Sequence, residues 1–291
     1  MLEIGAGGDP HPQASILLDR YPDADGARQR GGLDLVRDSR PLIQADGSRL
    51  PFRDGQFDYV IASHVLEHVP DPAGFVAELQ RVAEGGYIET PSLIYERMRA
   101  IPEHLWFVHL ADGVVYLAPR SDPDAWTGLT DVLFDQPTFR RAVEALADVF
   151  FVGMEWQQSL RVVTCESLEE LIARIPANWM QSAVDSSDAR QLRLRREKPL
   201  IRRFARAALP PIAVTAVRRA AQALPVTRER AVMTAEAFRP AAWRALVVCP
   251  QCLGSLVEGA GGILDCTHCG KRFRVRADDV PCLLLDLESC S

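Results

Sequence analysis

A short apolar run that leads into closely spaced glycines occupies residues 2–8, with the sequence Leu-Glu-Ile-Gly-Ala-Gly-Gly. This pattern predicts the first strand of a doubly wound α/β domain, followed by its ligand-binding loop. Glycine is required in such a loop because the backbone turns sharply and approaches a ligand with no Cβ in the way. Two glycines in one turn are common, so the assignment depends on the rest of the chain.

Three later apolar runs are each followed directly by a polar side chain. Asp19 follows residues 14–18, Asp46 follows residues 42–45, and Ser63 and His64 follow residues 57–62. Open α/β sheets bind their ligands at the carboxyl ends of the strands. We therefore expect these side chains to lie along one ligand-binding edge. In the alternative, Asp19 and Asp46 are solvated turn residues. This explains each aspartate by itself but not why three successive apolar runs all end in polar side chains.

The order and spacing of three motifs carry a family resemblance. They are Glu-Ile-Gly-Ala-Gly at residues 3–7, Ala-Asp-Gly-x-x-Leu-Pro-Phe at residues 45–52, and residues 57–69, which end in His-Val-Leu-Glu-His-Val. Together they resemble the small-molecule branch of the class I S-adenosylmethionine-dependent methyltransferases, over about residues 1–165. The resemblance implies a Rossmann-like α/β sheet and S-adenosyl-L-methionine as the methyl donor.

The resemblance also implies a set of cofactor-binding residues. By this resemblance, the methionine end of the cofactor would contact the loop that contains Glu3, Gly5 and Gly7. The ribose hydroxyls would contact Asp19, and the adenine would contact Asp46 and Gly47. Ser63 completes the expected set. S-adenosylmethionine is net cationic, because its sulfonium and ammonium outweigh one carboxylate, and acidic strand ends suit it. A dinucleotide pyrophosphate instead prefers a helix N-terminus. Residues 9–13 are too few for the usual first helix, so we expect NAD not to bind.

Composition and charge predict three parts. Residues 1–186 form the expected methyltransferase domain, with an insertion at residues 93–130 that contains an Ala-Asp-Gly hairpin signal. Residues 187–244 are basic and punctuated by proline, and are expected to form a helical linker. The net charge is −14 for residues 1–186 (15 bases, 29 acids) and +10 for residues 187–244 (14 bases, 4 acids). Residues 245–291 are expected to form a zinc-ribbon domain.

Two further elements are predicted between the insertion and the linker. Asp135, followed by Pro137, predicts the start of a helix that runs to about Ala147. The apolar runs at residues 150–156 and 160–164 predict the hairpin that closes the sheet of such domains.

Four cysteines, Cys249, Cys252, Cys266 and Cys269, form two Cys-x-x-Cys pairs separated by thirteen residues. This spacing is typical of a zinc ribbon, in which four thiolates complete a tetrahedron and leave no position for catalysis. We therefore expect structural Zn²⁺. With residues 279–284, the cysteines resemble the small zinc-ribbon activator subunit of tRNA and protein methyltransferases, here fused to a methyltransferase. The sequence lacks a signal-peptide pattern and a membrane-spanning run, which predicts a cytoplasmic protein with metal-bound rather than disulfide-bonded cysteines.

His64 and Glu89 are the candidate catalytic residues. His64 ends a strand beside the cofactor motif, and a neutral imidazole can accept a hydroxyl proton; the alternative is that it caps the next helix or only lines the pocket. Glu89 falls in the expected fifth strand, where a carboxylate is costly to bury unless it is used or paired. Aligning acceptor, methyl and sulfur would supply much of the rate, because the sulfonium is already an activated donor.

The methyl acceptor is predicted only by class. Methyltransferases that act on base amines or amides often have an Asn/Asp-Pro-Pro-aromatic motif after the fourth strand, whereas this chain has Ser63-His64-Val65. This favours O- or C-methylation of a small molecule or an envelope glycan precursor. Two other hypotheses are an S-adenosylmethionine-binding adaptor that activates a partner methyltransferase, and a tRNA or protein methyltransferase; the acidic catalytic half disfavours nucleic acid. Residues 190–219 either dock on that acidic half or make peripheral membrane contact.

Overall fold

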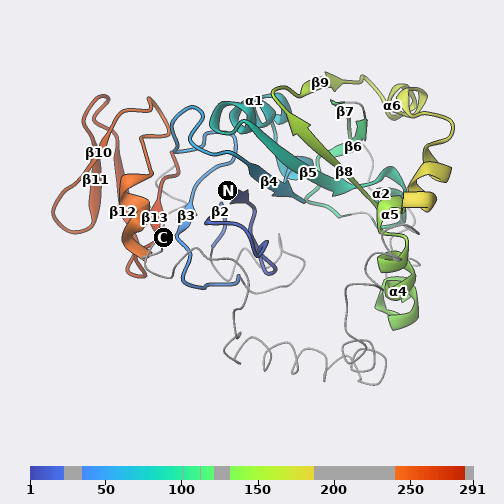
Figure 1. The fold of residues 1–291 in the computed structure, drawn as a ribbon, viewed down its shortest axis with the longest axis horizontal. Helices are drawn as coiled ribbons and strands as arrows, with labels where there is room; N and C mark the ends of the chain where they lie inside the picture. Colours follow the sequence, from blue (N-terminus) through green and yellow to red (C-terminus); the bar gives the residue numbers. More distant parts are fainter. Residues whose placement is uncertain (23–34, 100, 112, 121–131, 187–239, 286–291) are drawn as a thin grey trace.

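The computed structural model describes residues 1–22, 35–99, 101–111, 113–120, 132–186 and 240–285. Its main element is a sheet with the strand order β10-β11-β12-β13-β3-β2-β1-β4-β5-β8 (Figure 1). Six of these strands belong to the N-terminal part: β1 Leu2–Ile4, β2 Ile16–Asp19, β3 Leu42–Gln44, β4 Val60–Ser63, β5 Gly85–Pro91 and β8 Phe151–Gln157. The predicted mixed α/β sheet is thus confirmed.

Strands β3, β2, β1, β4 and β5 are parallel neighbours, and β8 is antiparallel to β5. These short apolar strands are almost completely buried, as expected where both faces of a parallel sheet are covered. Only turns connect β1 to β2, in agreement with the prediction that no first helix fits there. The strand order reverses between β1 and β4, which places the ends of these two strands at the switch point where such sheets bind ligands.

The helix α1 (Pro72–Val82) follows the short 3-10 helix η2 (Leu66–His68). Asp71 caps α1 by accepting a hydrogen bond from the Gly74 amide at 2.9 Å. Phe75 and Leu79 are fully buried in the core that includes residues of β1 and β4. These buried apolar side chains attach α1 to the sheet, shortly after β4 and His64.

Two strands of the insertion and one later strand form a second, three-stranded sheet in the order β6-β7-β9, with β6 Trp106–Ala111, β7 Val114–Pro119 and β9 Arg161–Thr164. The predicted hairpin of β6 and β7 is confirmed. The predicted hairpin of residues 150–156 and 160–164 is wrong, because β9 pairs in parallel with β7 rather than with β8. Gln158 adopts a φ of +68° at the end of β8, and the Leu160 amide donates to Gln80 of α1 at 2.7 Å, so the chain turns away from β8.

Further helices of this part include α2 Leu93–Met98, α4 Pro137–Ala145, α5 Ala147–Phe150 and α6 Leu168–Arg174. The helix predicted near Asp135 is present, but its N-cap is Gln136, which makes no side-chain capping bond. Among the described residues, no helix has both the length and the apolar character needed to cross a membrane.

The C-terminal ribbon consists of η3 Pro240–Ala245, β10 Leu256–Glu258, β11 Ile263–Cys266, β12 Arg272–Val275 and β13 Pro281–Cys282. It continues the main sheet at one end of the molecule (Figure 1), because β13 pairs in parallel with β3. The Leu283 amide donates to the carbonyl of Gln44 at 2.7 Å, and the Val248 amide to that of Pro51 at 2.9 Å. Trp243, within the expected linker, is 1% exposed and donates its indole N–H to the main-chain carbonyl of Asp279 at 3.0 Å.

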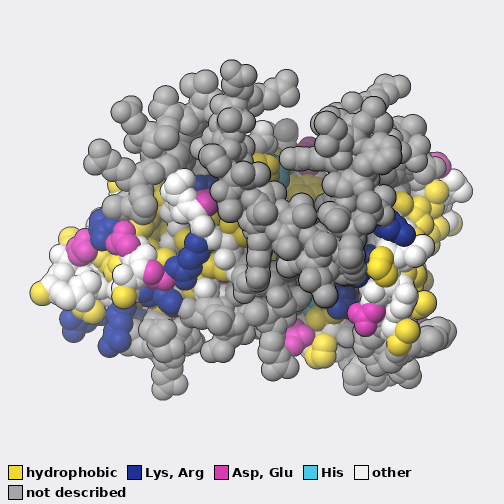
Figure 2. Space-filling view, turned by 90° about the horizontal axis from the view of Figure 1, so that it is seen from below, with side chains coloured by type: hydrophobic (Ala, Val, Ile, Leu, Met, Phe, Trp, Pro, Cys, Tyr) yellow, Lys and Arg dark blue, Asp and Glu magenta, His cyan; other side chains and the backbone are white. Residues whose placement is uncertain are grey.

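The ribbon surface mixes charges of both signs (Figure 2). Arg244 pairs with Glu258 at 2.8 Å and with Asp279 at 2.9 Å, and Arg272 pairs with Asp265 at 3.0 Å. The segment 190–219, with its two alternative roles, lies outside the described residues.

Candidate functional site

The glycine loop after β1 has the backbone that its sequence predicts. Gly5 and Gly7 have φ values of +69° and +53°, in the left-handed region that side chains with a Cβ rarely adopt. A Cβ on Gly5 would lie 2.4 Å from Cγ2 of Val65, which follows β4. Gly5 is therefore required both by the turn and by the close approach of the two segments at the switch point.

Asp19, the last residue of β2, holds this loop in place. One carboxylate oxygen accepts from the Gly7 amide at 3.3 Å, and the other accepts from the Tyr21 amide at 2.8 Å. Asp19 is 6% exposed. Because each carboxylate oxygen has two lone pairs, both oxygens can still accept a hydrogen bond from a ribose hydroxyl.

Glu3 lies inside β1 and is 6% exposed. Its carboxylate accepts a hydrogen bond from the His11 amide at 2.8 Å. Burial raises the pKa of Glu3 to about 7, although the His11 bond and the charge of Arg40 act in the opposite direction. This acid therefore titrates in the neutral range.

Asp46, two residues after β3, forms an ion pair with Arg20 and accepts from the Ser48 amide at 2.8 Å. A cavity of about 260 Å³ opens beside it, lined by Arg20, Asp46, Ser48, Arg49, Leu283, Leu284 and Leu285. The ribbon thus contributes a wall next to Asp46. Gly47 has a packing role of its own, because a Cβ there would lie 2.6 Å from the ring of Phe75.

His64 and Glu89 are brought together, as the sequence predicts for adjacent strand ends. Ser63 is in register with Glu89, and the His64 amide donates to the Glu89 carbonyl at 2.9 Å. His64 Nε2 lies 3.6 Å from Glu89 Oε1, and its Nδ1 lies 3.6 Å from Glu67 Oε1. The second oxygen of Glu89 accepts from the Tyr87 hydroxyl at 2.7 Å, so the carboxylate in this interior strand is paired.

The surroundings of His64 affect its protonation. Burial is the largest influence and lowers the pKa of His64, but the carboxylates of Glu67, Glu89 and Glu96 raise it, and the net direction is upward. The imidazolium is thus more favoured than in an ordinary histidine, which weakens the interpretation of His64 as a neutral base. The ring remains 45% exposed, so a substrate has access to it.

The four cysteines of the ribbon form one cluster, with their sulfur atoms all within 4.8 Å of one another. Cys249 Sγ lies 3.7 Å from Cys269 Sγ, and Cys252 Sγ lies 3.5 Å from Cys266 Sγ. A tetrahedron with Zn–S bonds near 2.3 Å has edges of about 3.8 Å, which these spacings fit. A Cβ on Gly254 would lie 3.2 Å from the Cys266 sulfur, so a glycine at this position avoids a close contact with the cluster.

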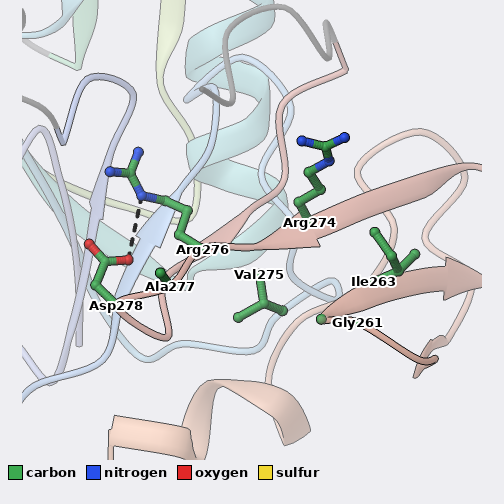
Figure 3. A pocket seen from close by; sticks show the side chains of 8 residues that line it. Gly261, Ile263, Arg274, Val275, Arg276, Ala277 and Asp278 are labelled. Carbon is green, nitrogen blue, oxygen red and sulfur yellow. Dashed lines mark ion pairs between the residues drawn. The ribbon is translucent and has the colours of Figure 1, made fainter.

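A larger cavity of about 610 Å³ lies on the ribbon, and none of the four cysteines lines it (Figure 3). Ile263 and Val275 line it, together with the pair Arg276–Asp278, whose Nε–Oδ1 distance is 3.5 Å. It contains none of the residues that the sequence predicts for the site.

Some residues of the site were not predicted. Arg20 directly follows Asp19, and its position one residue beyond a strand end was the available signal. In the insertion, His104 and His109 are 6% and 2% exposed, which leaves little of either ring accessible to an acceptor. Trp106 instead donates its indole N–H to the Val69 carbonyl at 2.8 Å.

Comparison with known proteins adds a family match. Residues 17–88 match the family described as methyltransferase domain. An uncharacterized methyltransferase of Mycobacterium avium is 34% identical over 90 residues, which cover 28% of this chain and 35% of the relative. A demethylmenaquinone methyltransferase of Mycolicibacterium paratuberculosis is 28% identical over 130 residues, which cover 40% of this chain and 52% of the relative. The chain thus spans about a third to a half of the length of these relatives.

Among solved structures, an S-adenosylmethionine-dependent methyltransferase from Mesorhizobium loti is similar, with a TM-score of 0.27 and 16% identity. The match covers 62% of this chain and 71% of that chain.

Proposed function

We propose that the chain is an S-adenosylmethionine-dependent methyltransferase, with the cofactor at the carboxyl ends of β1 to β4. The observation that carries this proposal is the convergence of the Gly5 loop, Asp19 and Asp46 along one edge of a doubly wound sheet. The match of residues 17–88 to a methyltransferase domain and the names of the relatives support it. Asp19 and Asp46 place negative charge at the ends of β2 and β3, which suits the cationic donor.

The acceptor that we propose is a small molecule or an envelope glycan precursor, methylated on oxygen or carbon. The printed name of one relative, demethylmenaquinone methyltransferase, describes a small-molecule acceptor. In this proposal His64 and Glu89 face the acceptor from neighbouring strand ends, and a hydroxyl proton would pass to His64 when the ring is neutral. S-adenosylmethionine supplies the activated methyl group, and the protein supplies alignment.

The ribbon has a structural role in this proposal. Cys249, Cys252, Cys266 and Cys269 would hold one Zn²⁺ as four thiolates, which leaves no open coordination position. Because β13 pairs with β3 in the same chain, the ribbon supports the edge of the sheet next to Asp46. The same pairing argues against the adaptor hypothesis, since this strand of the ribbon is already occupied within its own chain.

Transfer of label from S-adenosyl[methyl-³H]methionine tests the proposal, using the purified full chain and fractionated metabolite extracts. We expect label to enter a small-molecule or glycan fraction with this protein alone. Failure to transfer label in any fraction, together with transfer after a second methyltransferase is added, would support the adaptor hypothesis. Label that enters tRNA or protein would overturn the proposed acceptor class but not the activity.

The pKa of Glu3 predicts a pH dependence of cofactor binding. If binding of the cationic methionine end requires ionised Glu3, the fraction of competent protein rises as pH increases toward and past 7. Affinity for S-adenosylmethionine should then be on the order of tenfold tighter at pH 7 than at pH 5.5. Calorimetry over this range measures it, and Glu3→Gln should remove the dependence. An equally steep profile in that variant would assign the effect to another group.

A further inference from the structure

Three polar side chains outside the strand ends meet between η2 and the insertion. Glu67 and His68 belong to η2, and His104 lies just before β6. One ligand atom from each of these residues lies within 4.8 Å of the other two. The Leu105 amide donates to the Glu67 carbonyl at 2.7 Å and fixes the two segments to each other. We call these three residues the Glu67 cluster.

The carboxylate of Glu67 is the unusual member of the cluster. Glu67 is 1% exposed, and neither of its carboxylate oxygens accepts a hydrogen bond from any residue that the structure describes. The ring of His64 stands 3.6 Å away, an ion-pair distance that is longer than a hydrogen bond. A buried carboxylate that accepts no hydrogen bond favours positive charge beside it, either from a protonated His64 or from a bound cation.

The two histidines are arranged as metal ligands commonly are. Nδ1 of His104 is hydrogen-bonded to the carboxylate of Glu96, whose other oxygen lies 3.0 Å from Arg120 Nη1. Nδ1 of His68 faces the Glu103 carbonyl at 3.2 Å. In metal sites the ring nitrogen that does not bind the ion usually donates to a carboxylate or a carbonyl, and this fixes the tautomer. Nε2 of each ring is therefore the nitrogen left for an ion.

We propose that Glu67, His68 and His104 bind one divalent transition-metal ion, separate from the cysteine cluster. Two imidazoles and one carboxylate suit Zn²⁺, Co²⁺ or Fe²⁺, whereas Mg²⁺ and Ca²⁺ prefer oxygen ligands throughout. The ion would join η2 to the insertion and hold Glu67 at its distance from His64. This inference goes beyond the proposed function, because none of the three residues belongs to the cofactor-binding set.

Metal content of the full chain tests the proposal. After incubation with excess Zn²⁺ and desalting, we expect about two equivalents of Zn²⁺ in the wild type, one for each cluster. Glu67→Gln keeps the shape of the side chain and removes its charge, and should lose about one equivalent. Glu103→Gln is the matched control, because the substitution leaves in place the main-chain carbonyl that faces His68, and it should keep both.

Co²⁺ substitution of the wild type identifies the second site without any variant. Four thiolates give intense charge-transfer absorption, whereas a site of two imidazoles and a carboxylate gives only weak visible bands. We expect one equivalent of Co²⁺ with the thiolate absorption and one equivalent with the weak visible bands. If the wild type binds a single equivalent of Co²⁺ and shows thiolate absorption alone, the Glu67 cluster binds no metal and the proposal is overturned. A Glu67→Gln variant that keeps both ions would also overturn it. If that variant does not fold, the wild-type stoichiometry and spectrum decide.

Discussion

If the cysteine cluster holds Zn²⁺ as proposed, replacement of Cys252 by Ser is expected to remove the ion and to unfold the ribbon in an otherwise folded chain. A hydroxyl is a poor substitute for a thiolate ligand, and three thiolates leave the tetrahedron incomplete. Structural zinc contributes on the order of 10 kcal/mol to modules of this kind, more than the small core around Trp243 and Phe273 can replace. We therefore expect the whole ribbon to lose its folded structure cooperatively, rather than only the residues around Cys252.

The consequence should extend to the N-terminal part of the chain, because the ribbon and this part share one sheet. Loss of β13 removes the Leu283–Gln44 hydrogen bond and exposes β3 as an edge. It also removes Leu283, Leu284 and Leu285 from the cavity beside Asp46. We expect weaker binding of S-adenosylmethionine in the Cys252→Ser variant even though no predicted cofactor-binding residue has changed.

Three measurements check this prediction: the thiolate absorption of Co²⁺-loaded protein, limited proteolysis with mapping of the cut sites, and calorimetry with S-adenosylmethionine. Cuts should appear within residues 246–285. Cys165→Ala is the control, since Cys165 is also buried but lies outside the cluster, and it should keep the metal. A Cys252→Ser protein with unchanged thiolate absorption or an intact ribbon would contradict the prediction.

Local sequence signals were sufficient for the backbone and the positions of several candidate site residues. Glycine spacing predicted the positive φ angles of Gly5 and Gly7, and strand-end polarity predicted the positions of Asp19 and Asp46. Both properties depend on the backbone of a few consecutive residues, so a single sequence contains them. The cysteine spacing likewise predicted a cluster whose pairs lie close in the chain.

Contacts between distant segments were not predictable in this way. The pairing of β9 with β7 instead of β8 depends on a turn at Gln158, and the pairing of β13 with β3 joins segments more than two hundred residues apart. The Glu67 cluster also depends on folding, because His104 reaches η2 only when the insertion packs against it. No periodicity or spacing rule relates such positions.

Replacement of Gly5 by Ala is expected to impair both stability and methyl transfer, and Gly113 provides a matched control. Both glycines have φ near +70°, so alanine costs about 1–2 kcal/mol at either position through the backbone alone. A Cβ on Gly113 meets nothing within 4 Å, whereas a Cβ on Gly5 would lie 2.4 Å from Cγ2 of Val65. Val65 is β-branched and rotates little, so the loop itself must move.

Displacement of the loop should affect the methionine end of the donor, and misplacement by about 1 Å can reduce the rate on the order of a hundredfold. We therefore expect Gly113→Ala to lower only the unfolding free energy, and Gly5→Ala to lower the unfolding free energy, cofactor affinity and transfer rate. Denaturant unfolding and calorimetry measure the first two. Adding Val65→Ala should restore part of the affinity, because it removes the clashing methyl group. Equal losses of affinity in the Gly5 and Gly113 variants would mean that the loop does not hold the donor.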